Sequence, residues 1–579
     1  MKATSLLRYT GKYKKPLILC PLVMIGEVTM ETTIPLMIAK LIDEAIPHSE
    51  QTGDISQVLL YGGLMVLMAL VSMAFGMAGS NLSSVGGMGF GRNLRKALFE
   101  KVQHFSFKNI DHFSTASLVT RMTTDVNQTQ NTLMMLVRGV IRSPIMFIMA
   151  LVMALQLNPS LTTVLFVAIP LLICGIYVIM KLAFPRFQVM MKKYDALNAS
   201  VQENLIAIRV VKAFVRADFE KKKFGDAADD VTNAQRAAER VVLWNSPLMQ
   251  ILMYGCIVAV LWFGGRQIIG GNLQVGALFS FITYVTQILM SLMMVSFLFV
   301  SIVMSRASIS RILEVLQEEP DIHNGAQPAQ TVENGAIDFD HVGFSYAGDA
   351  DNLVLEDIDL HIRSGETIGI IGATGSAKTT LVSLIPRLYD VTTGRLRVGG
   401  RDVKDYDMHA LRDQVAMVLQ KNVLFSGTIK ENLRWGDEHA TDEEIAAACR
   451  AAAADEFIRS FPDGYDTDLG QGGVNVSGGQ KQRLCIARAL LKKPKIMILD
   501  DATSAVDTAT DARIREALRT AMPETTKIII AQRITSVMDA DRVVVLNDGR
   551  IADVGTHEEL MERSEIYRDV YTSQQKGVA

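Results

Sequence analysis

The residues with the clearest chemistry lie between positions 367 and 385. An apolar run at 367–371, typical of a buried strand, precedes the sequence GATGSAKTT at 372–380 and a second apolar run at 381–385 that favours a helix. A strand, a glycine-rich loop, Lys-Thr and a helix in this order indicate a phosphate-binding loop. Its backbone N–H groups and the start of the helix would point at an anion. The loop residues expected to bind nucleotide are Gly372, Thr374, Gly375, Ser376, Ala377, Lys378, Thr379 and Thr380.

Two side chains of this loop have separate roles. We expect Lys378 to reach the β- and γ-phosphates of ATP and the Thr379 hydroxyl to bind Mg²⁺. The loop departs from the usual pattern at Ala377, where glycine is expected. If the backbone there needs a positive φ, alanine costs about 1–2 kcal/mol, and if φ is negative it costs little.

Further motifs follow in an order that identifies a family. An apolar run at 496–499 ends in Asp500, which is expected to bind Mg²⁺, and Val476 precedes Ser477-Gly478-Gly479-Gln480. Together with the phosphate loop, these segments resemble the ATPase domain of ABC transporters. The resemblance extends to Tyr346 as the ring that stacks on adenine, Gln420 as the glutamine that reaches Mg²⁺, and Asp507 in the loop that follows Asp500 and Asp501.

The resemblance implies that ATP is held between two such domains, arranged head to tail. Tyr346, the phosphate loop, Gln420 and Asp500 would serve this chain's own site, with Thr379, Gln420 and Asp500 around Mg²⁺. The residues expected to contact ATP held by the partner chain are Ser477, Gly478, Gly479, Gln480 and Asp507. The helix after Ser477 would present its positive N-terminus to that phosphate.

Two positions depart from the family in the same reaction. Asp501 stands where the family has its catalytic Glu, and Gln532 stands where it has the switch His. A carboxylate shortened by one methylene is misplaced by about 1 Å, which can cost about 10²-fold in rate. Losing one donor to the transition state costs about 10²–10³. We therefore expect the own site to bind ATP and hydrolyse it poorly, in a heterodimer with a sister half-transporter; the alternative is a slow homodimer in which Asp501 acts as the base.

The rest of the chain divides by composition. Its 579 residues exceed one domain, and its net charge of −3 without a basic stripe argues against a nucleic-acid partner. Five widely separated cysteines favour neither disulfides nor a zinc site. We expect an all-α transmembrane domain of six helices with long cytoplasmic extensions, followed by an α/β P-loop ATPase domain. The expected parts are a transmembrane domain at 1–305, a linker at 306–335, an ATPase domain at 336–573 and a tail at 574–579.

Six stretches are long and apolar enough to span the bilayer. They lie near 17–43, 57–83, 133–156, 160–182, 243–264 and 275–304. The segments 84–132 and 183–242 are rich in Lys and Arg, whereas 44–56 and 157–159 have none. Basic residues stay on the cytoplasmic side. The sequence therefore predicts a multi-pass protein of the cell membrane with both termini and the ATPase domain in the cytoplasm.

Two acids lie within the first span. Glu27 and Glu31 are one helical turn apart, and a charge at such depth costs about 2.5–3.5 kcal/mol. They either attract a cationic amphiphile or form an ion pair with Arg138 or Arg142. The resemblance favours export of hydrophobic or amphipathic small molecules, as in multidrug exporters. Lipid export and import of a siderophore by the same fold are the alternatives.

Overall fold

Among the residues that the structure describes, six helical segments are long and apolar enough to cross a membrane, as the sequence predicts. The computed structural model describes residues 3–576, without the side chains of 3, 4, 296, 299, 300, 303, 304 and 576. Chain contacts divide the protein into two units, here called the transmembrane unit (Met1–Gln103 and Thr115–Glu318) and the ATPase unit (His104–Ser114 and Glu319–Ala579). Residues 104–114 thus belong with the ATPase unit, although they lie within the expected 1–305 segment.

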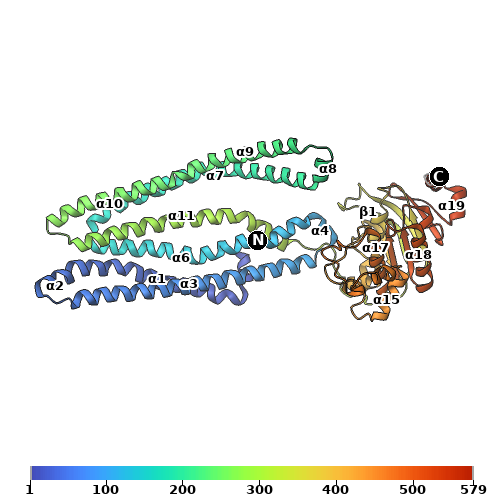
Figure 1. The fold of residues 1–579 in the computed structure, drawn as a ribbon, viewed down its shortest axis with the longest axis horizontal. Helices are drawn as coiled ribbons and strands as arrows, with labels where there is room; N and C mark the ends of the chain where they lie inside the picture. Colours follow the sequence, from blue (N-terminus) through green and yellow to red (C-terminus); the bar gives the residue numbers. More distant parts are fainter. Residues whose placement is uncertain (1–2, 577–579) are drawn as a thin grey trace. The chain divides into compact units, whose positions relative to one another are not determined.

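The transmembrane unit is built from long helices joined by short turns. In chain order its helices are η1 (Ala3–Tyr13), α1 (Lys14–Lys40), η2 (Leu41–Ala45), α2 (Ile46–Thr52), α3 (Ser56–Gln103), α5 (Thr115–Thr120), η3 (Arg121–Asp125), α6 (Val126–Leu157), α7 (Pro159–Ile206), α8 (Ile208–Ala213), α9 (Ala217–Leu243), α10 (Asn245–Ile269) and α11 (Val275–Gln317). Within this unit, α7 to α10 form one long hairpin with α8 at its tip (Figure 1). Helix α11 continues to Gln317, so the first part of the expected linker is helical.

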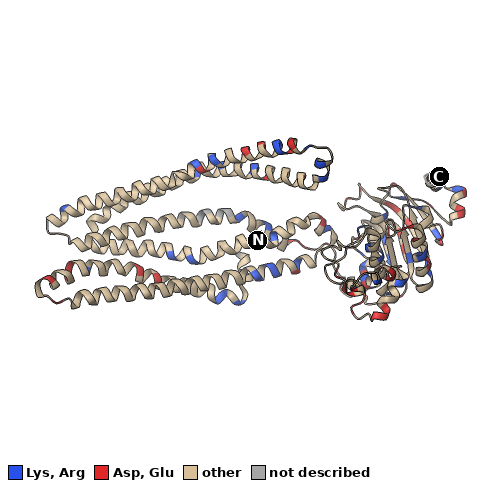
Figure 2. Ribbon diagram, viewed as in Figure 1, with Lys and Arg blue, Asp and Glu red and all other residues tan. Residues whose placement is uncertain are grey.

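Charged residues are unevenly spread over this unit. Long stretches of α3, α6, α7, α10 and α11 carry few of them, whereas Lys, Arg, Asp and Glu gather around α8 and along α9 (Figure 2). Apolar side chains such as Leu67, Phe166 and Ile251 are exposed on the long helices. Such a surface suits a hydrocarbon solvent, and the charged hairpin tip suits water.

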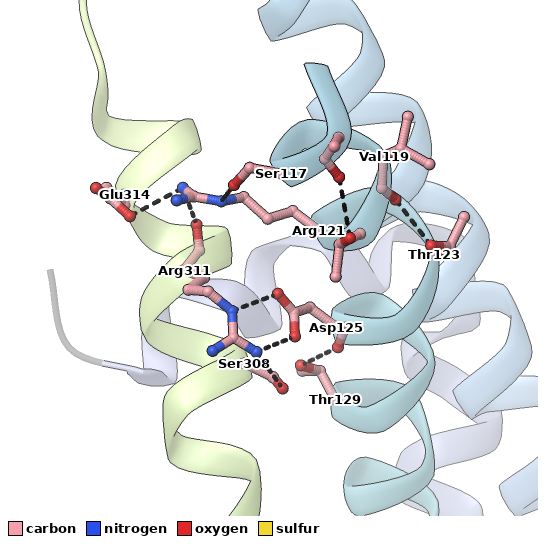
Figure 3. Close-up of polar contacts among 11 residues, drawn as sticks. Ser117, Val119, Arg121, Thr123, Asp125, Thr129, Ser308, Arg311 and Glu314 are labelled. Atoms are coloured by element: carbon pink, nitrogen blue, oxygen red, sulfur yellow. Dashed lines mark hydrogen bonds and ion pairs between the residues drawn. The ribbon is translucent and has the colours of Figure 1, made fainter. Parts of the chain in front are cut away.

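Carboxylates fix helix α11 at two places. Near its start, the Asp43 carboxylate accepts hydrogen bonds from Gly276 N at 2.6 Å and Ala277 N at 2.9 Å. Near its end, Arg311 binds the buried Asp125 carboxylate with two nitrogens, the Nε–Oδ2 distance being 2.7 Å (Figure 3). Arg121 extends this cluster to Glu314, whose oxygen lies 2.9 Å away, and to the Arg311 carbonyl (Figure 3).

The ATPase unit contains two sheets. The antiparallel sheet has the order β2-β1-β4-β5, and the larger one has the order β10-β9-β3-β8-β7-β6, parallel from β9 to β6. The strands are β1 (Ile337–Phe344), β2 (Leu355–Ile362), β3 (Thr367–Ile371), β4 (Thr393–Val398), β5 (Arg401–Asp402), β6 (Val415–Val418), β7 (Ile496–Asp500), β8 (Thr526–Ile530), β9 (Arg542–Asn547) and β10 (Arg550–Gly555). Their apolar side chains form two cores, one on either side of β3, β7 and β8.

Helices cover these sheets. They are α12 (Lys378–Leu384), α13 (Met408–Asp413), α14 (Ile429–Leu433), α15 (Asp442–Ala451), α16 (Asp455–Arg459), α17 (Gly478–Leu491), α18 (Thr508–Ala521), α19 (His557–Arg563) and α20 (Glu565–Lys576), with α4 (Phe107–His112) joining from the 104–114 segment. Helix α20 includes residues 574–576, which the sequence assigned to a tail. The parallel register pairs Asp500 with Ile530, so the carboxyl ends of β3, β7 and β8 meet at one edge. Ligands bind at such edges in α/β sheets.

Candidate nucleotide-binding site

The phosphate loop connects the end of β3 to the start of α12. The Lys378 Nζ donates to the carbonyls of Gly372 at 2.9 Å and Ala373 at 2.8 Å, and lies 3.3 Å from Ser376 Oγ. Its ammonium group is therefore held over the loop, where phosphate oxygens could replace the carbonyls. Burial lowers the pKa of Lys378, while the nearby Asp500 and Asp501 raise it. Thr374 and Gly375 are exposed at the tip of the loop.

Backbone geometry explains one glycine of this loop and makes its alanine costly. A Cβ on Gly372 would lie 2.2 Å from the Leu546 carbonyl oxygen of β9, so only glycine fits there. Ala377 has φ of 66°, in the left-handed region. Of the two cases that the sequence left open, the costly one therefore applies, at about 1–2 kcal/mol. The chain keeps the loop geometry and accepts strain at this position.

Two of the three expected Mg²⁺ ligands are in direct contact. The Thr379 hydroxyl donates to Asp500 Oδ2 at 2.8 Å, beside the phosphate loop. Burial raises the pKa of Asp500, and the bond from Thr379 opposes this. A hydroxyl and a carboxylate are the hard oxygen ligands that Mg²⁺ prefers, and Mg²⁺ bound with ATP needs only one or two protein ligands. These residues therefore fit the ion, which when bound would neutralise phosphate charge.

Asp501, the acid that follows Asp500, accepts hydrogen bonds from two side-chain amides. Gln532 Nε2 donates to Asp501 Oδ2 at 2.9 Å, and Gln420 Nε2 lies 3.4 Å from the same oxygen. Asp501 is buried at the end of β7 with φ of 51°. Burial raises the pKa of Asp501, and the two amides oppose this because they stabilise the carboxylate. Gln420, the third expected Mg²⁺ ligand, and Gln532 thus both bind the same oxygen atom of Asp501.

The start of helix α17 carries Ser477-Gly478-Gly479-Gln480, here called the signature. Ser477 is its N-cap: Gln480 N donates to Ser477 Oγ at 3.3 Å, and Ser477 N donates to Gln480 Oε1 at 2.8 Å. A Cβ on Gly479 would lie 2.7 Å from the Ala505 carbonyl oxygen, so the glycine allows the 501–505 segment to approach. The reciprocal cap fixes the start of a 14-residue helix, whose N-terminus suits an anion.

One buried glutamine, which sequence reasoning did not single out, joins helix α17 to the 501–505 segment. Gln482 Nε2 donates to Ser504 Oγ at 3.2 Å, and Gln482 Oε1 accepts from Ala505 N at 3.0 Å. A polar residue on the inner side of a helix was the available signal, because buried amides need partners. Nearby, Asp507 caps α18 by accepting from Thr510 N at 2.9 Å, and this bond lowers the pKa of Asp507.

The comparisons with known proteins agree with these features. Residues 17–292 match the family described as the ABC transporter transmembrane region, and residues 355–504 match the family described as ABC transporter. The uncharacterized ABC transporter ATP-binding protein YfiB of Bacillus subtilis (strain 168) is 40% identical over 553 residues, covering 96% of this chain and 95% of that protein. This chain belongs to the ABC transporter family. The resemblance drawn from its motifs is confirmed.

Two further comparisons concern the type of ABC transporter. The putative multidrug export ATP-binding/permease protein YgaD of Bacillus subtilis (strain 168) is 31% identical over 584 residues, covering 98% of each chain. The structure of a bacterial Atm1-family ABC exporter with ATP bound superposes with a TM-score of 0.82 at 25% identity, covering 97% of this chain and 98% of that one. Family, fold and motif set together place the chain among the ATP-driven ABC exporters.

In this ABC transporter, the expected adenine-binding ring lies among aromatic residues. The Tyr346 hydroxyl is 3.0 Å from Thr380 Oγ1, and its ring is half-exposed. Tyr389, which sequence reasoning missed, meets the Tyr346 ring edge-on at 5.2 Å between centroids. The Tyr389 hydroxyl donates to Asp111 Oδ2 at 2.7 Å, and Phe107 of α4 lies 6.1 Å from its ring. The aromatic residues around Tyr346 therefore contact α4 through Tyr389.

The membrane acids of the transporter share one arginine. Arg142 Nη2 lies 2.8 Å from Glu31 Oε2, and Arg142 Nε lies 3.4 Å from Glu27 Oε1. Of the two partners that the sequence offered, the structure selects Arg142 on α6 over Arg138. Glu27 is buried, and its Oε2 has no hydrogen-bond partner among the described residues, whereas the Glu31 side chain is 36% exposed.

Proposed function

We propose that this chain is one half of a heterodimeric exporter whose own ATP site binds nucleotide but hydrolyses it poorly. One observation carries the proposal: the Asp501 carboxylate is engaged by the amides of Gln532 and Gln420 at 2.9 and 3.4 Å. A general base must reach the water whose proton it accepts, and the amide donors on this Asp501 oxygen occupy the lone pairs that such a water would need. Lys378, Thr379 and Asp500, which would hold phosphate and Mg²⁺, make their hydrogen bonds away from this carboxylate.

The proposed division of labour follows from the head-to-tail arrangement of the family. The signature of this chain, capped and held against Ala505, would complete the competent site of a sister half-transporter. The weak site would stay occupied by ATP between cycles and keep the two ATPase domains together. We further propose that both termini and the ATPase unit lie on the cytoplasmic side and that the cargo is a hydrophobic or amphipathic small molecule.

The test compares two variants of the purified transporter. Ser477→Ala should strongly impair ATP turnover, because it alters the signature at the competent site. Asp501→Ala should lower turnover far less, because that position already lacks about two orders of magnitude of rate by the geometric estimate. If the Asp501→Ala protein is the less active one, the chain hydrolyses ATP in its own site and the proposed asymmetry fails.

A matched control separates signature chemistry from helix capping. Thr441 caps α15 with the same reciprocal pattern, accepting from Glu444 N at 3.3 Å. Thr441→Ala should therefore cost about as much stability as Ser477→Ala, typically about 1 kcal/mol, and leave turnover nearly unchanged. Equal losses of turnover in the two variants would reduce the role of Ser477 to that of a cap.

For the cargo, we propose that Glu27 and Glu31 contact its cationic part, with Arg142 as their counter-ion when no cargo is bound. The partial exposure of Glu31 supports this role. In transporter reconstituted in vesicles, Glu27→Gln with Glu31→Gln should reduce transport of cationic dyes more than of neutral ones. Equal losses for both dyes with lower thermal stability would identify a purely structural ion pair.

A further inference from the structure

Helix α20 contacts the segment 532–534, here called the switch segment, through the side chain of Gln574. Gln574 Nε2 donates to the Gln532 carbonyl oxygen at 2.7 Å, and Ile534 N donates to Gln574 Oε1 at 2.9 Å. A single amide thus binds the backbone on both sides of residue 533, just after β8. The side chain of the same Gln532 donates to Asp501 Oδ2 at 2.9 Å.

Helix α20 is well placed to fix this segment. Tyr567 is fully buried in the same core cluster as Ile534, and its hydroxyl lies 2.8 Å from His557 Nδ1. Tyr571 packs against this cluster from one turn further along. Gln574 follows Tyr567 and Tyr571 at the spacing that places residues on one helix face. The buried tyrosines therefore determine where the Gln574 amide stands.

We propose that Gln574 is a positioning residue for the switch position: through it, helix α20 sets the place of the Gln532 amide relative to Asp501 and the γ-phosphate of ATP. The inference rests on the proposed assignment of Gln532 to the chain's own ATP site. Without Gln574, the Gln532 carbonyl and the Ile534 N–H would bond to water, and the segment would lose its fixed spacing from Asp501. ATP binding would weaken, whereas ADP, which lacks the γ-phosphate, would bind as before.

The experiment uses the full-length transporter with Mg²⁺ and photolabelling of this subunit by azido-ATP, in competition with AMP-PNP or ADP. Gln574→Ala should weaken competition by AMP-PNP about threefold to tenfold, the range expected if the one hydrogen bond from the Gln532 amide to the γ-phosphate is lost, and change competition by ADP by less than about twofold. Gln574→Glu should do the same, because it keeps the acceptor for Ile534 N and loses the donor to Gln532. Gln575→Ala is the matched control: the same residue type, exposed and one position on, with no expected effect.

A double variant tests the route. Gln532→Ala with Gln574→Ala should be no worse toward AMP-PNP than Gln532→Ala alone, since Gln574 acts through Gln532. Additive losses, equal losses for AMP-PNP and ADP, or a Gln574→Ala protein that behaves like Gln575→Ala would each overturn the proposal. If Gln532→Ala itself leaves the preference for AMP-PNP over ADP unchanged, the assignment of Gln532 to this site fails, and the role of Gln574 fails with it.

Hydrogen exchange provides a second readout on the same proteins. In Gln574→Ala, peptides covering residues 531–536 should exchange faster, while peptides of the phosphate loop at 372–380 should exchange as in the unmodified protein. This pattern would support local positioning. Faster exchange throughout the ATPase unit would show that Gln574 supports the whole fold, and would overturn the specific role.

Discussion

Replacing Ala377 by glycine should stabilise the ATPase unit, contrary to the usual effect of glycine. With φ of 66°, the Cβ of Ala377 costs about 1–2 kcal/mol in the folded loop. Glycine removes that cost and gives back about 0.5–1 kcal/mol through the greater freedom of the unfolded chain. The net gain is about 0.5–1 kcal/mol, which corresponds to roughly 1–4 °C in Tm for a domain of this size. Because the strain is present with and without nucleotide, ATP affinity should change by less than about threefold.

Trp435 is a suitable probe, being the one tryptophan of the three in the chain that lies in the ATPase unit. It stacks on Phe425 at 4.2 Å between ring centroids, so its fluorescence should change when the unit unfolds. The measurement is thermal unfolding of the full-length protein in a background where the other two tryptophans, Trp244 and Trp262, are phenylalanine.

Two alanines provide controls of opposite sign. Ala453 also has a positive φ, 54°, and Ala453→Gly should raise Tm by a similar amount. Ala447 is exposed in the interior of α15, where glycine should cost about 1 kcal/mol. If Ala377→Gly lowers Tm as Ala447→Gly does, the loop does not adopt the left-handed geometry, and the reasoning about its strain is wrong.

Three further predictions follow from the same site. Azido-ATP should label this subunit, and Lys378→Ala should abolish the labelling, since the ammonium is predicted to be the loop's charged contact with phosphate; persistent labelling would exclude that role. Gly479→Ala should reduce ATP turnover more than Gly478→Ala, because the new Cβ would lie 2.7 Å from the Ala505 oxygen in the first case and 3.9 Å from the Ala505 side chain in the second; equal turnover would contradict this. Burial raises the pKa of Asp501, so between the ordinary pKa of about 3.9 and the raised value the native state holds a proton that the unfolded chain has lost. Stability without nucleotide should therefore fall as pH rises through that interval, and Asp501→Asn should flatten the decrease in thermal unfolding scans.

What the sequence could predict depends on how far apart the interacting residues are. The phosphate loop, the strand ending in Asp500 and the cap at Ser477 were predictable because each is set by neighbouring residues. The sign of φ at Ala377 was not, since the residue types on either side of it allow both signs and the folded path of the loop from β3 to α12 decides. The contact of Tyr389 with Asp111 joins positions 278 residues apart, and no local pattern encodes it.

The membrane region shows the same limit. Long apolar runs indicated six spans, and the part of the chain that the structure describes has six helical segments of the required kind. Helix ends were less predictable: α7 runs from Pro159 to Ile206 without a break, so hydropathy finds the apolar stretch at 160–182 but not the end of the helix. For Glu27 and Glu31 the sequence offered Arg138 and Arg142, which lie one turn apart on the same helix, and only the packing of α1 on α6 selects between them.

The carboxylates on helix α11 have a mechanical consequence. With Asp43 bound at its start and Asp125 bound near its end, this 43-residue helix cannot slide along its neighbours without breaking charged contacts. At 1.5 Å per residue the helix is about 65 Å long. As one continuous helix, it couples a movement of one end to a movement of the other. A small rotation applied at Gln317, where α11 ends, would turn α6 and η2 with it. If transport is driven from the Gln317 end, α11, α6 and η2 would therefore rotate together as one rigid group.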